Sequence, residues 1–404
     1  MQTLLTSGET PTVAVRVQRS RLVLLGTIAV AFNLVAFVLV QLGNAELEKG
    51  DFKMFYTAAI ALRSGHAADL YSREFTIAMQ RKILPSLPLE DVKVYTHPPY
   101  ELLVFLPLSF FPYKVACYCW LGITVLLGLV CGRMLPGYVA VLGLFPFLAT
   151  VLEQQDSVLV LLIVIGCWQA LRDGHDARAG FLLGLALFRF QIVLPLALVL
   201  LFWRPRLIKG FAVSAILVTL LSLAMVGPAG TRSYAGYVSA MVHDSAAAVS
   251  TRYKVDPRTN PSLRGLVYEL VARGRENVSP AAARALPTGV VILDLLAIAF
   301  ACSFMRAKAP GEIKFAFAVL VALLLSFHLL MHDLVLLAVP FVLLRGQSAR
   351  WPLLPFYVAP LIYCFYPYSQ SWLALLLACS CLLLAFPRIV AAGKMGGAVE
   401  SASA

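Results

Sequence analysis

The stretch "GFLLGLALFRFQIVLPLALVLLFW", residues 180–203, decides the fold class, because it is apolar over the length of a membrane span and carries a single charge. A helix needs about 20 apolar residues to cross the hydrocarbon core of a bilayer. Arg189 lies nine residues into this run, which places it about 13 Å deep at 1.5 Å per residue. A centred arginine costs at least about 2.5–3.5 kcal/mol, so we expect an anion to meet it.

The whole chain shares this apolar character. Hydrophobic residues make up 60% of it and charged residues 13%, with a mean hydropathy of +0.83. Soluble domains carry about 45–50% apolar and about 25% charged residues. The net charge of +12 comes from short basic clusters between apolar runs, which indicates membrane topology and argues against a nucleic-acid partner. We therefore predict an all-α polytopic membrane protein.

Apolar runs predict about twelve membrane spans, several of them short. With this count the short basic loops fall on the cytoplasmic side, as the positive-inside rule requires. We expect a multi-pass protein of the plasma membrane with a cytoplasmic tail at 1–21, a membrane domain at 22–390 and a second cytoplasmic tail at 391–404. The expected spans cover residues 22–42, 98–111, 114–132, 138–152, 157–171, 180–203, 209–227, 288–305, 313–330, 333–344, 350–366 and 370–387.

Two long loops fall on the non-cytoplasmic side, and each contains a predicted helix. The loop at 43–97 contains "GDFKMFYTAAIALRSG", whose apolar residues have helical spacing and stop at a glycine. We expect this helix to lie on the membrane face, with Phe55 and Tyr56 at the level of the lipid headgroups. The loop at 228–287 contains "NPSLRGLVYEL", which predicts a helix capped by Asn260.

Ionisable residues inside the apolar runs are candidates for function, because such residues are rare in membrane spans. Arg189 has two interpretations that we weigh equally. It could form a structural pair with a carboxylate such as Asp294 in "VVILDLLAIAF", or it could bind a phosphate in a membrane-embedded cavity. His97 in "YTHPPYELL" precedes two prolines, and a structural turn is the favoured interpretation there.

Two histidines in "SFHLLMHDLVLL" are four residues apart, so a helix would place them on one face. This spacing could bind a metal, but it lacks the glutamate of H-E-x-x-H and no third ligand stands nearby. We expect no metal and no cofactor. A polar helix end at the membrane boundary is the favoured interpretation for His332, whereas His328 is favoured for function.

Several motifs in a fixed order resemble glycosyltransferase family 87. They are "GDFKMFYTAAIALRSG", "ADLY" at 68–71, "YTHPPYELLVFLPLSFFP", the run from "EQQDS" at 153–157 through "FRFQIVLPLALVLLFWRP", "NPSLRG" and "SFHLLMHDLVLLAVP". The resemblance covers roughly residues 22–390. The family is grouped with polyprenol-phosphate-mannose-dependent mannosyltransferases of the GT-C fold, so the resemblance implies a GT-C-like helical bundle.

The resemblance also implies an activity. It is the transfer of a hexose, commonly mannose, from a polyprenyl-phosphate-linked donor to a glycolipid or glycan acceptor at the non-cytoplasmic face of the bilayer. In GT-C enzymes the acid of the first external loop is the catalytic base, and that position is Asp51 here, with Phe52 beside it. No D-x-D-like motif stands near Asp51.

The chemistry agrees with these residue types. An acceptor hydroxyl needs a base within reach, and the departing phosphate needs positive charge, for which Arg189, Arg264 and His328 are candidates. One base without a paired carboxylate favours direct displacement with inversion. The candidate catalytic residues are Asp51 and His328, and the candidate substrate-binding residues are Phe52, Tyr56, Arg189, Asn260, Arg264, His332 and Asp333.

Two other functions remain open from the sequence. A transporter or flippase of a lipid-linked sugar would also need many spans and buried charges, but transporters usually show internal repeats, and we find none. A membrane scaffold would leave Arg189 unexplained. The discriminating observation is whether the fold brings Asp51, Arg189 and His328 to one outer-facing cavity.

Overall fold

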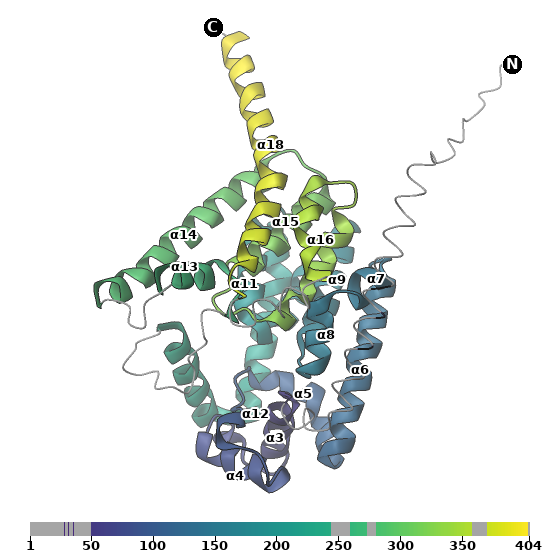
Figure 1. Cartoon of the computed structure of the whole chain (residues 1–404), viewed down its shortest axis with the longest axis vertical. Coiled ribbons are helices and arrows are strands. Elements are labelled where there is room, and N and C mark those ends of the chain that lie inside the picture. The colour runs from purple at the N-terminus through teal and green to yellow at the C-terminus, as the bar shows by residue number, and fades with distance from the viewer. Residues whose placement is uncertain are drawn as a thin grey trace, which may run out of the picture.

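The computed structural model describes residues 50–243, 259–272, 280–357 and 370–402, together with residues 28, 31 and 35. Within these ranges every regular element is a helix, which confirms the predicted all-α class. In Figure 1, α3 and α4 lie at one end of the molecule and α18 extends from the other. The α-helices are α3 (Phe52–Arg63), α4 (Arg73–Ile83), α5 (Leu102–Phe105), α6 (Tyr113–Met134), α7 (Tyr138–Leu142), α8 (Phe145–Leu152), α9 (Ser157–Arg172), α10 (Asp176–Leu185), α11 (Phe190–Leu201), α12 (Leu207–His243), α13 (Leu263–Ala272), α14 (Pro280–Arg306), α15 (Gly311–Leu324), α16 (Ala338–Leu343) and α18 (Leu373–Ala402).

Short 3-10 helices connect many of these elements and provide several functional residues. They lie at Ala67–Asp69, Leu89–Asp91, Pro99–Glu101, Leu106–Phe110, Leu187–Arg189, Met331–Leu337 and Ser348–Leu353.

Three of the described helices are long and apolar enough to cross a membrane, namely segments of α6, α12 and α14. The pair of α10 and α11 adds a fourth if it counts as one span. The predicted count of about twelve is not confirmed, because other apolar runs form shorter helices, such as α9 with 16 residues and α15 with 14. The predicted spans at 22–42 and 350–366 lie wholly or partly outside the described residues, apart from residues 28, 31 and 35.

The run that decided the fold class is not one straight helix. Its two halves, α10 and α11, meet at an angle of 64°, and the 3-10 turn Leu187–Arg189 joins them. The expectation that Arg189 lies inside a continuous helix is therefore wrong. Irregular backbone at membrane depth is tolerated where it is buried in protein, and the break allows the guanidinium to reach the protein interior.

Helices α10 and α12 approach each other closely through glycines. A Cβ atom on Gly180 would lie 2.0 Å from the carbonyl oxygen of Leu207, and one on Gly210 would lie 1.7 Å from that of Ala177. Glycine at such positions allows helix backbones to pack at short distance in membrane proteins. This contact holds the first half of the bent pair against α12.

Helix α3 ends where the sequence predicts, but it is not a surface helix. Ser64 follows its last residue and Gly65 has φ +81°, a left-handed conformation that glycine adopts without strain. The expected position at the membrane face is wrong, because Phe55 is fully buried and Tyr56 is 6% exposed. The Phe55 ring stacks on Phe105, with centroids 4.3 Å apart. The aromatic face of α3 therefore anchors the helix to the protein core.

Candidate functional site

A cavity of about 230 Å³ lies between the start of α3, the loop before α5 and the turn that follows α15. Asp51, Arg189 and His328, which are far apart in the sequence, all line it. This convergence favours a catalytic site over a membrane scaffold. The other polar residues that line the cavity are Arg73, Lys93, Thr96, His97, Gln155 and His332.

Asp51 occupies the N-cap position of α3 and directs its carboxylate into the cavity. Its backbone N–H donates to the carbonyl oxygen of Glu153, at 2.9 Å. Its Oδ1 atom lies 3.0 Å from Nζ of Lys93, and its Oδ2 accepts a hydrogen bond from Nε2 of Gln155. The side chain is 19% exposed. The carboxylate is therefore fixed in position but accessible from the cavity.

The segment that joins α8 to α9 shapes the floor of the site. Gln154 has φ +58°, which is uncommon for a residue other than glycine, and its carbonyl oxygen accepts from Nε1 of Trp120 at 3.0 Å. This turn directs Gln155 towards Asp51. Gly50 packs against the same turn so closely that a Cβ atom would lie 2.5 Å from Cδ of Gln154. A glycine before Asp51 therefore allows the two segments to meet.

Arg189 is buried, at 3% exposure, and its guanidinium already has several partners. Its Nε atom donates to Oδ1 of Asp156 at 3.0 Å, and its Nη2 donates to Oε1 of Gln155 at 2.6 Å. Asp333 also contributes, because its Oδ1 lies 3.5 Å from Nη1. The interpretation of a pair with Asp294 is therefore wrong. The carboxylate that pairs with Arg189 is Asp156, and the charge that acts on Asp294 is Arg264.

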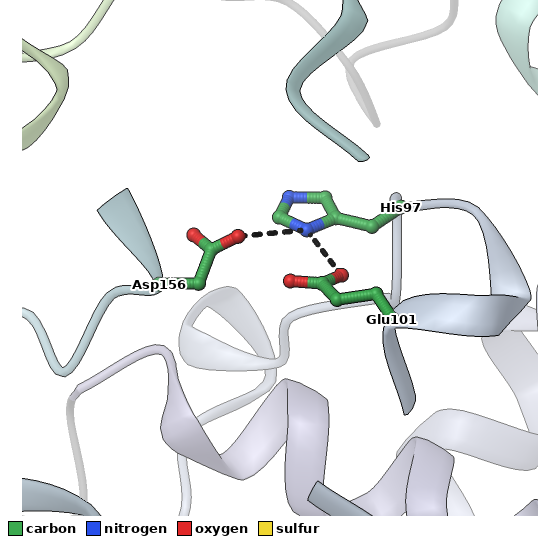
Figure 2. Close-up of side chains that lie close together, drawn as sticks. All are labelled: His97, Glu101 and Asp156. Carbon is green, nitrogen blue, oxygen red and sulfur yellow. Dashed lines mark hydrogen bonds and ion pairs between the residues drawn. The ribbon is translucent and has the colours of Figure 1, made fainter. Parts of the chain in front are cut away.

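His97 joins the site through a pair of buried carboxylates, which Figure 2 shows. Its Nδ1 atom lies 2.7 Å from Oε2 of Glu101 and 3.6 Å from Oδ2 of Asp156. The other ring nitrogen lies on the side of the imidazole away from both carboxylates. Burial, reinforced by the nearby positive charge of Arg189, lowers the pKa of His97 to about 3. His97 is therefore neutral at physiological pH and acts as a fixed hydrogen-bonding group at the cavity wall.

The same three residues form a group whose ligand types could hold a metal ion. His97, Glu101 and Asp156 each offer a ligand atom, and these atoms lie within 4.8 Å of one another. However, both oxygens of Asp156 already accept hydrogen bonds from Arg189. The guanidinium supplies the positive charge that a cation would otherwise bring to this carboxylate. We therefore assign no metal to the cluster.

The second histidine region lies in a turn rather than in the expected helix. Helix α15 ends at Leu324 and the 3-10 helix starts at Met331, so His328 and His332 do not share a helix face. Both nevertheless line the cavity. His332 Nδ1 is hydrogen-bonded to the Glu153 carboxylate. His328 Nδ1 is buried and has no hydrogen-bond partner among the described residues.

Asp333 stabilises this turn from within the protein and does not line the cavity. Its Oδ2 atom accepts from the backbone N–H of Leu330 at 3.1 Å, and its Oδ1 accepts from Oγ of Ser157 at 2.8 Å. Together with its contact to Arg189, these bonds connect the turn to the start of α9 and to the break between α10 and α11.

Asn260 also supports this turn, in a way that the sequence did not predict. Its Nδ2 donates to the carbonyl oxygen of Phe327 at 3.1 Å, and its Oδ1 accepts from the N–H of Leu329 at 3.3 Å. The predicted helix exists as α13, but its cap is Ser262, whose Oγ accepts from Gly265 N at 3.4 Å. Asn260 is therefore a clamp on the backbone that flanks His328.

Three sequence candidates lie away from the cavity. Phe52 and Tyr56 pack against Tyr113, with ring centroids 5.9 and 5.3 Å away, and Tyr56 donates to the carbonyl oxygen of Phe111 at 2.7 Å. Arg264 places its guanidinium over the ring of Tyr268, 5.4 Å from the centroid. None of the three lines the cavity. The site that we propose below leaves them out.

Sequence reasoning did not assign a role to Arg73, Lys93 or Gln155. Lys93 lies in an irregular loop, and Arg73 opens a polar helix, so neither has a distinctive spacing. Gln155 stands within "EQQDS", but the sequence does not show that its side chain contacts both Asp51 and Arg189.

The described helices and the cavity define an all-helical membrane protein in which buried charges surround one polar site. The model of glycosyltransferase family 87 matches residues 95–332, more than half of the chain, and the chain belongs to that family. It is accordingly a membrane glycosyltransferase. The match includes His97, Arg189 and His328, and it begins after Asp51. No curated protein and no solved structure matches the chain.

Proposed function

We propose that this glycosyltransferase transfers a hexose from a polyprenyl-phosphate-linked donor to a hydroxyl of a glycolipid or glycan acceptor. Mannose is the hexose that we propose. The observation that carries the proposal is the convergence of Asp51, Arg189 and His328 on one cavity. The lining of this cavity combines the accessible Asp51 carboxylate with several cationic and imidazole side chains, and the reaction requires both a base and groups that stabilise a phosphate.

Asp51 is the proposed general base. An acceptor hydroxyl is a poor nucleophile until a base takes its proton, and the base must lie within hydrogen-bond reach. The Asp51 carboxylate faces the cavity and is held from two sides by Lys93 and Gln155. Both neighbours are hydrogen-bond donors, so they hold the carboxylate oxygens in position at the cavity.

The proposed displacement proceeds with inversion at the anomeric carbon. Asp51 is the only carboxylate residue that lines the cavity in the part of the chain that the structure describes. A retaining mechanism through a covalent sugar intermediate would need a second carboxylate as nucleophile. Glu101, Asp156 and Asp333 are buried behind the wall in contacts with His97 and Arg189. The oxygen of the acceptor is therefore the proposed nucleophile, in a single step.

The buried carboxylates have a different proposed role, which is to position the polar wall. Asp156 orients the guanidinium of Arg189, and Glu101 orients the imidazole of His97. His328 also lines the cavity, and the described residues provide no hydrogen-bond partner for its buried Nδ1 atom. We assign to His328 a hydrogen bond to the donor phosphate or sugar.

The proposed reaction takes place at the non-cytoplasmic face of the plasma membrane, where a polyprenyl chain can remain in the bilayer while its phosphate enters the cavity. The distribution of basic loops supports this orientation. Cysteine-accessibility labelling in intact cells tests it. Position 51 should react with a membrane-impermeant reagent added outside, and reaction only after permeabilisation would reverse the assigned face.

The test of the function is incubation of the purified protein with a panel of polyprenyl-phosphate sugars and candidate acceptors. The expected result is release of polyprenyl phosphate together with a glycosylated acceptor, for one sugar in preference to the others. A lipid-linked sugar transporter would move the intact donor across a vesicle membrane without cleaving it. Movement of the donor without any release of polyprenyl phosphate would overturn the proposal.

A further inference from the structure

We propose that Lys93, assisted by Arg73, binds the phosphate of the donor, and that Lys93 exchanges its ion pair with Asp51 for one with that phosphate during transfer. This inference deepens the function proposed above and rests on it. It assigns the phosphate to two residues that the sequence did not single out, in place of Arg189.

The first step of the argument is the charge balance of the cavity wall. The guanidinium of Arg189 is bonded to Asp156 and lies 3.5 Å from Asp333, so two carboxylates surround one cation. A buried cation that is already compensated in this way attracts a further anion weakly. A donor phosphate therefore needs a cation from elsewhere in the cavity lining, and the remaining arginine and lysine residues that line it are Arg73 and Lys93.

The second step is the position of Lys93. Its Nζ atom lies 3.0 Å from Oδ1 of Asp51, and its side chain is 48% exposed. The negative charge of Asp51 raises the pKa of Lys93, so the ammonium group stays charged at neutral pH. A half-exposed lysine on a flexible stem can turn from one anion to another at short range.

The third step is the support for the Lys93 backbone. Although Lys93 lies in an irregular loop, two hydrogen bonds to a buried side chain hold its backbone. The side chain of Gln80 is fully buried, and its Nε2 donates to the carbonyl oxygen of Lys93 at 2.7 Å. The backbone N–H of Lys93 donates in return to Oε1 of Gln80 at 3.1 Å. Gln80 and Arg73 both belong to α4. One helix therefore holds the backbone of one proposed phosphate ligand and carries the other.

The fourth step is the movement of charge in the reaction. The acceptor oxygen forms a bond to the anomeric carbon, and the bond from that carbon to the phosphate oxygen breaks with its electron pair. The acceptor proton goes to Asp51. The phosphate changes from a diester with one negative charge to a monoester with two, while Asp51 becomes neutral. Lys93 therefore loses Asp51 as a counter-ion while the phosphate gains negative charge. Its pairing with the phosphate strengthens as the reaction proceeds, which stabilises the transition state more than the ground state.

The test measures binding of a short-chain polyprenyl phosphate to the purified protein, together with KM and kcat for the donor. Lys93→Ala should weaken polyprenyl phosphate binding by about 10- to 100-fold, the usual range for a charge-assisted hydrogen bond. Lys93→Arg should retain part of the affinity, because arginine also binds phosphate. Lys82→Ala is the matched control, since Lys82 is exposed on α4 and does not line the cavity.

The exchange itself has a separate readout. Asp51→Asn should tighten polyprenyl phosphate binding, because Lys93 no longer has to leave an ion pair. Adding Lys93→Ala to this variant should remove the gain. Inorganic phosphate, added as a competitor, shows whether the site binds the phosphate group alone or requires the lipid.

The outcomes separate this inference from the proposed function. If the wild type turns over the donor, and the affinity of Lys93→Ala for polyprenyl phosphate is within about twofold of the wild-type affinity, the inference is wrong and the function stands. An equal loss in Lys82→Ala would also overturn it, because general surface charge would then explain the effect. If the wild type binds polyprenyl phosphate through Lys93 but transfers no sugar, the anion site stands and the proposed function fails.

Discussion

The side-chain amide of Gln155 donates a hydrogen bond through Nε2 to Oδ2 of Asp51, although the two residues are 104 positions apart in the chain. The other end of the same amide, Oε1, accepts from Nη2 of Arg189 at 2.6 Å. A guanidinium can only donate, so the amide oxygen must face Arg189 and the amide nitrogen must face Asp51. Gln155 therefore holds Asp51 as a hydrogen-bond acceptor and connects it to the buried charges behind the cavity.

Replacing Gln155 with leucine should slow transfer without unfolding the protein. Loss of a hydrogen bond to a charged group costs about 1.5–3 kcal/mol, so we expect kcat to fall by about 10- to 100-fold. Gln169→Leu is the control, because Gln169 donates to the carbonyl oxygen of Met134 and neither residue lines the cavity. An unchanged kcat in Gln155→Leu would show that Asp51 does not depend on this bond.

Replacing Arg189 with glutamine should mainly destabilise the fold, because it leaves Asp156 and Asp333 buried without their cation. Removal of one partner from a buried pair costs about 3–5 kcal/mol. The double variant with Asp156→Asn should recover part of this loss in thermal unfolding, whereas addition of Asp294→Asn should not. If Asp294→Asn recovered the stability instead, Arg189 would pair with Asp294 and not with Asp156.

The backbone clamp formed by Asn260 should matter more for activity than the helix cap beside it. Asn260→Ala removes two hydrogen bonds to the turn that carries His328, worth about 1 kcal/mol each. Ser262→Ala removes the cap of α13, worth about 1 kcal/mol, and leaves the turn intact. We expect lower kcat in the first variant and normal kcat in the second, at a temperature where both are folded. Equal kcat values would show that the clamp does not position His328.

Lys53 gives a prediction for pH. Burial lowers the pKa of Lys53 to about 8, from the 10.5 that is usual for a lysine. The folded protein therefore binds fewer protons than the unfolded chain between these two pH values, and the cost of the buried charge is greatest below pH 8. Lys53→Met should raise the melting temperature at pH 7, and the difference should shrink as the pH rises from 8 to 10. Lys82→Met serves as the exposed control, and a difference that does not change with pH would contradict the assignment.

The sequence predicted the features that follow from composition and spacing. Membrane-length hydropathy indicated the all-helical class, and the glycine at position 65 marked the end of α3. Arg189 and His328 stand out because each is an ionisable residue within an apolar run, and Asp51 stands out because it matches the position of the base that the family resemblance implies. The fold then placed all three on one cavity.

The remaining features depend on tertiary contacts that no local pattern records. At the break, Arg189 pairs with Asp156, at the start of α9, and lies close to Asp333 in the 3-10 helix Met331–Leu337. The aromatic residues of α3 would suit either a lipid surface or a protein core, and the stacking of Phe55 on Phe105 decides for the core. Lys93 lies in an irregular loop, and its backbone is held by hydrogen bonds to Gln80 that the local sequence does not reveal.

The most direct test of the account is the turnover of Asp51→Asn with a polyprenyl-phosphate hexose, measured beside the wild type. The substitution removes the proposed base and keeps the size of the side chain. We predict a loss of about 10²- to 10⁴-fold in the rate of polyprenyl phosphate release, with donor binding no weaker than in the wild type and the melting temperature unchanged. Turnover near the wild-type rate would contradict the assignment of Asp51 as the base, and with it the proposed mechanism.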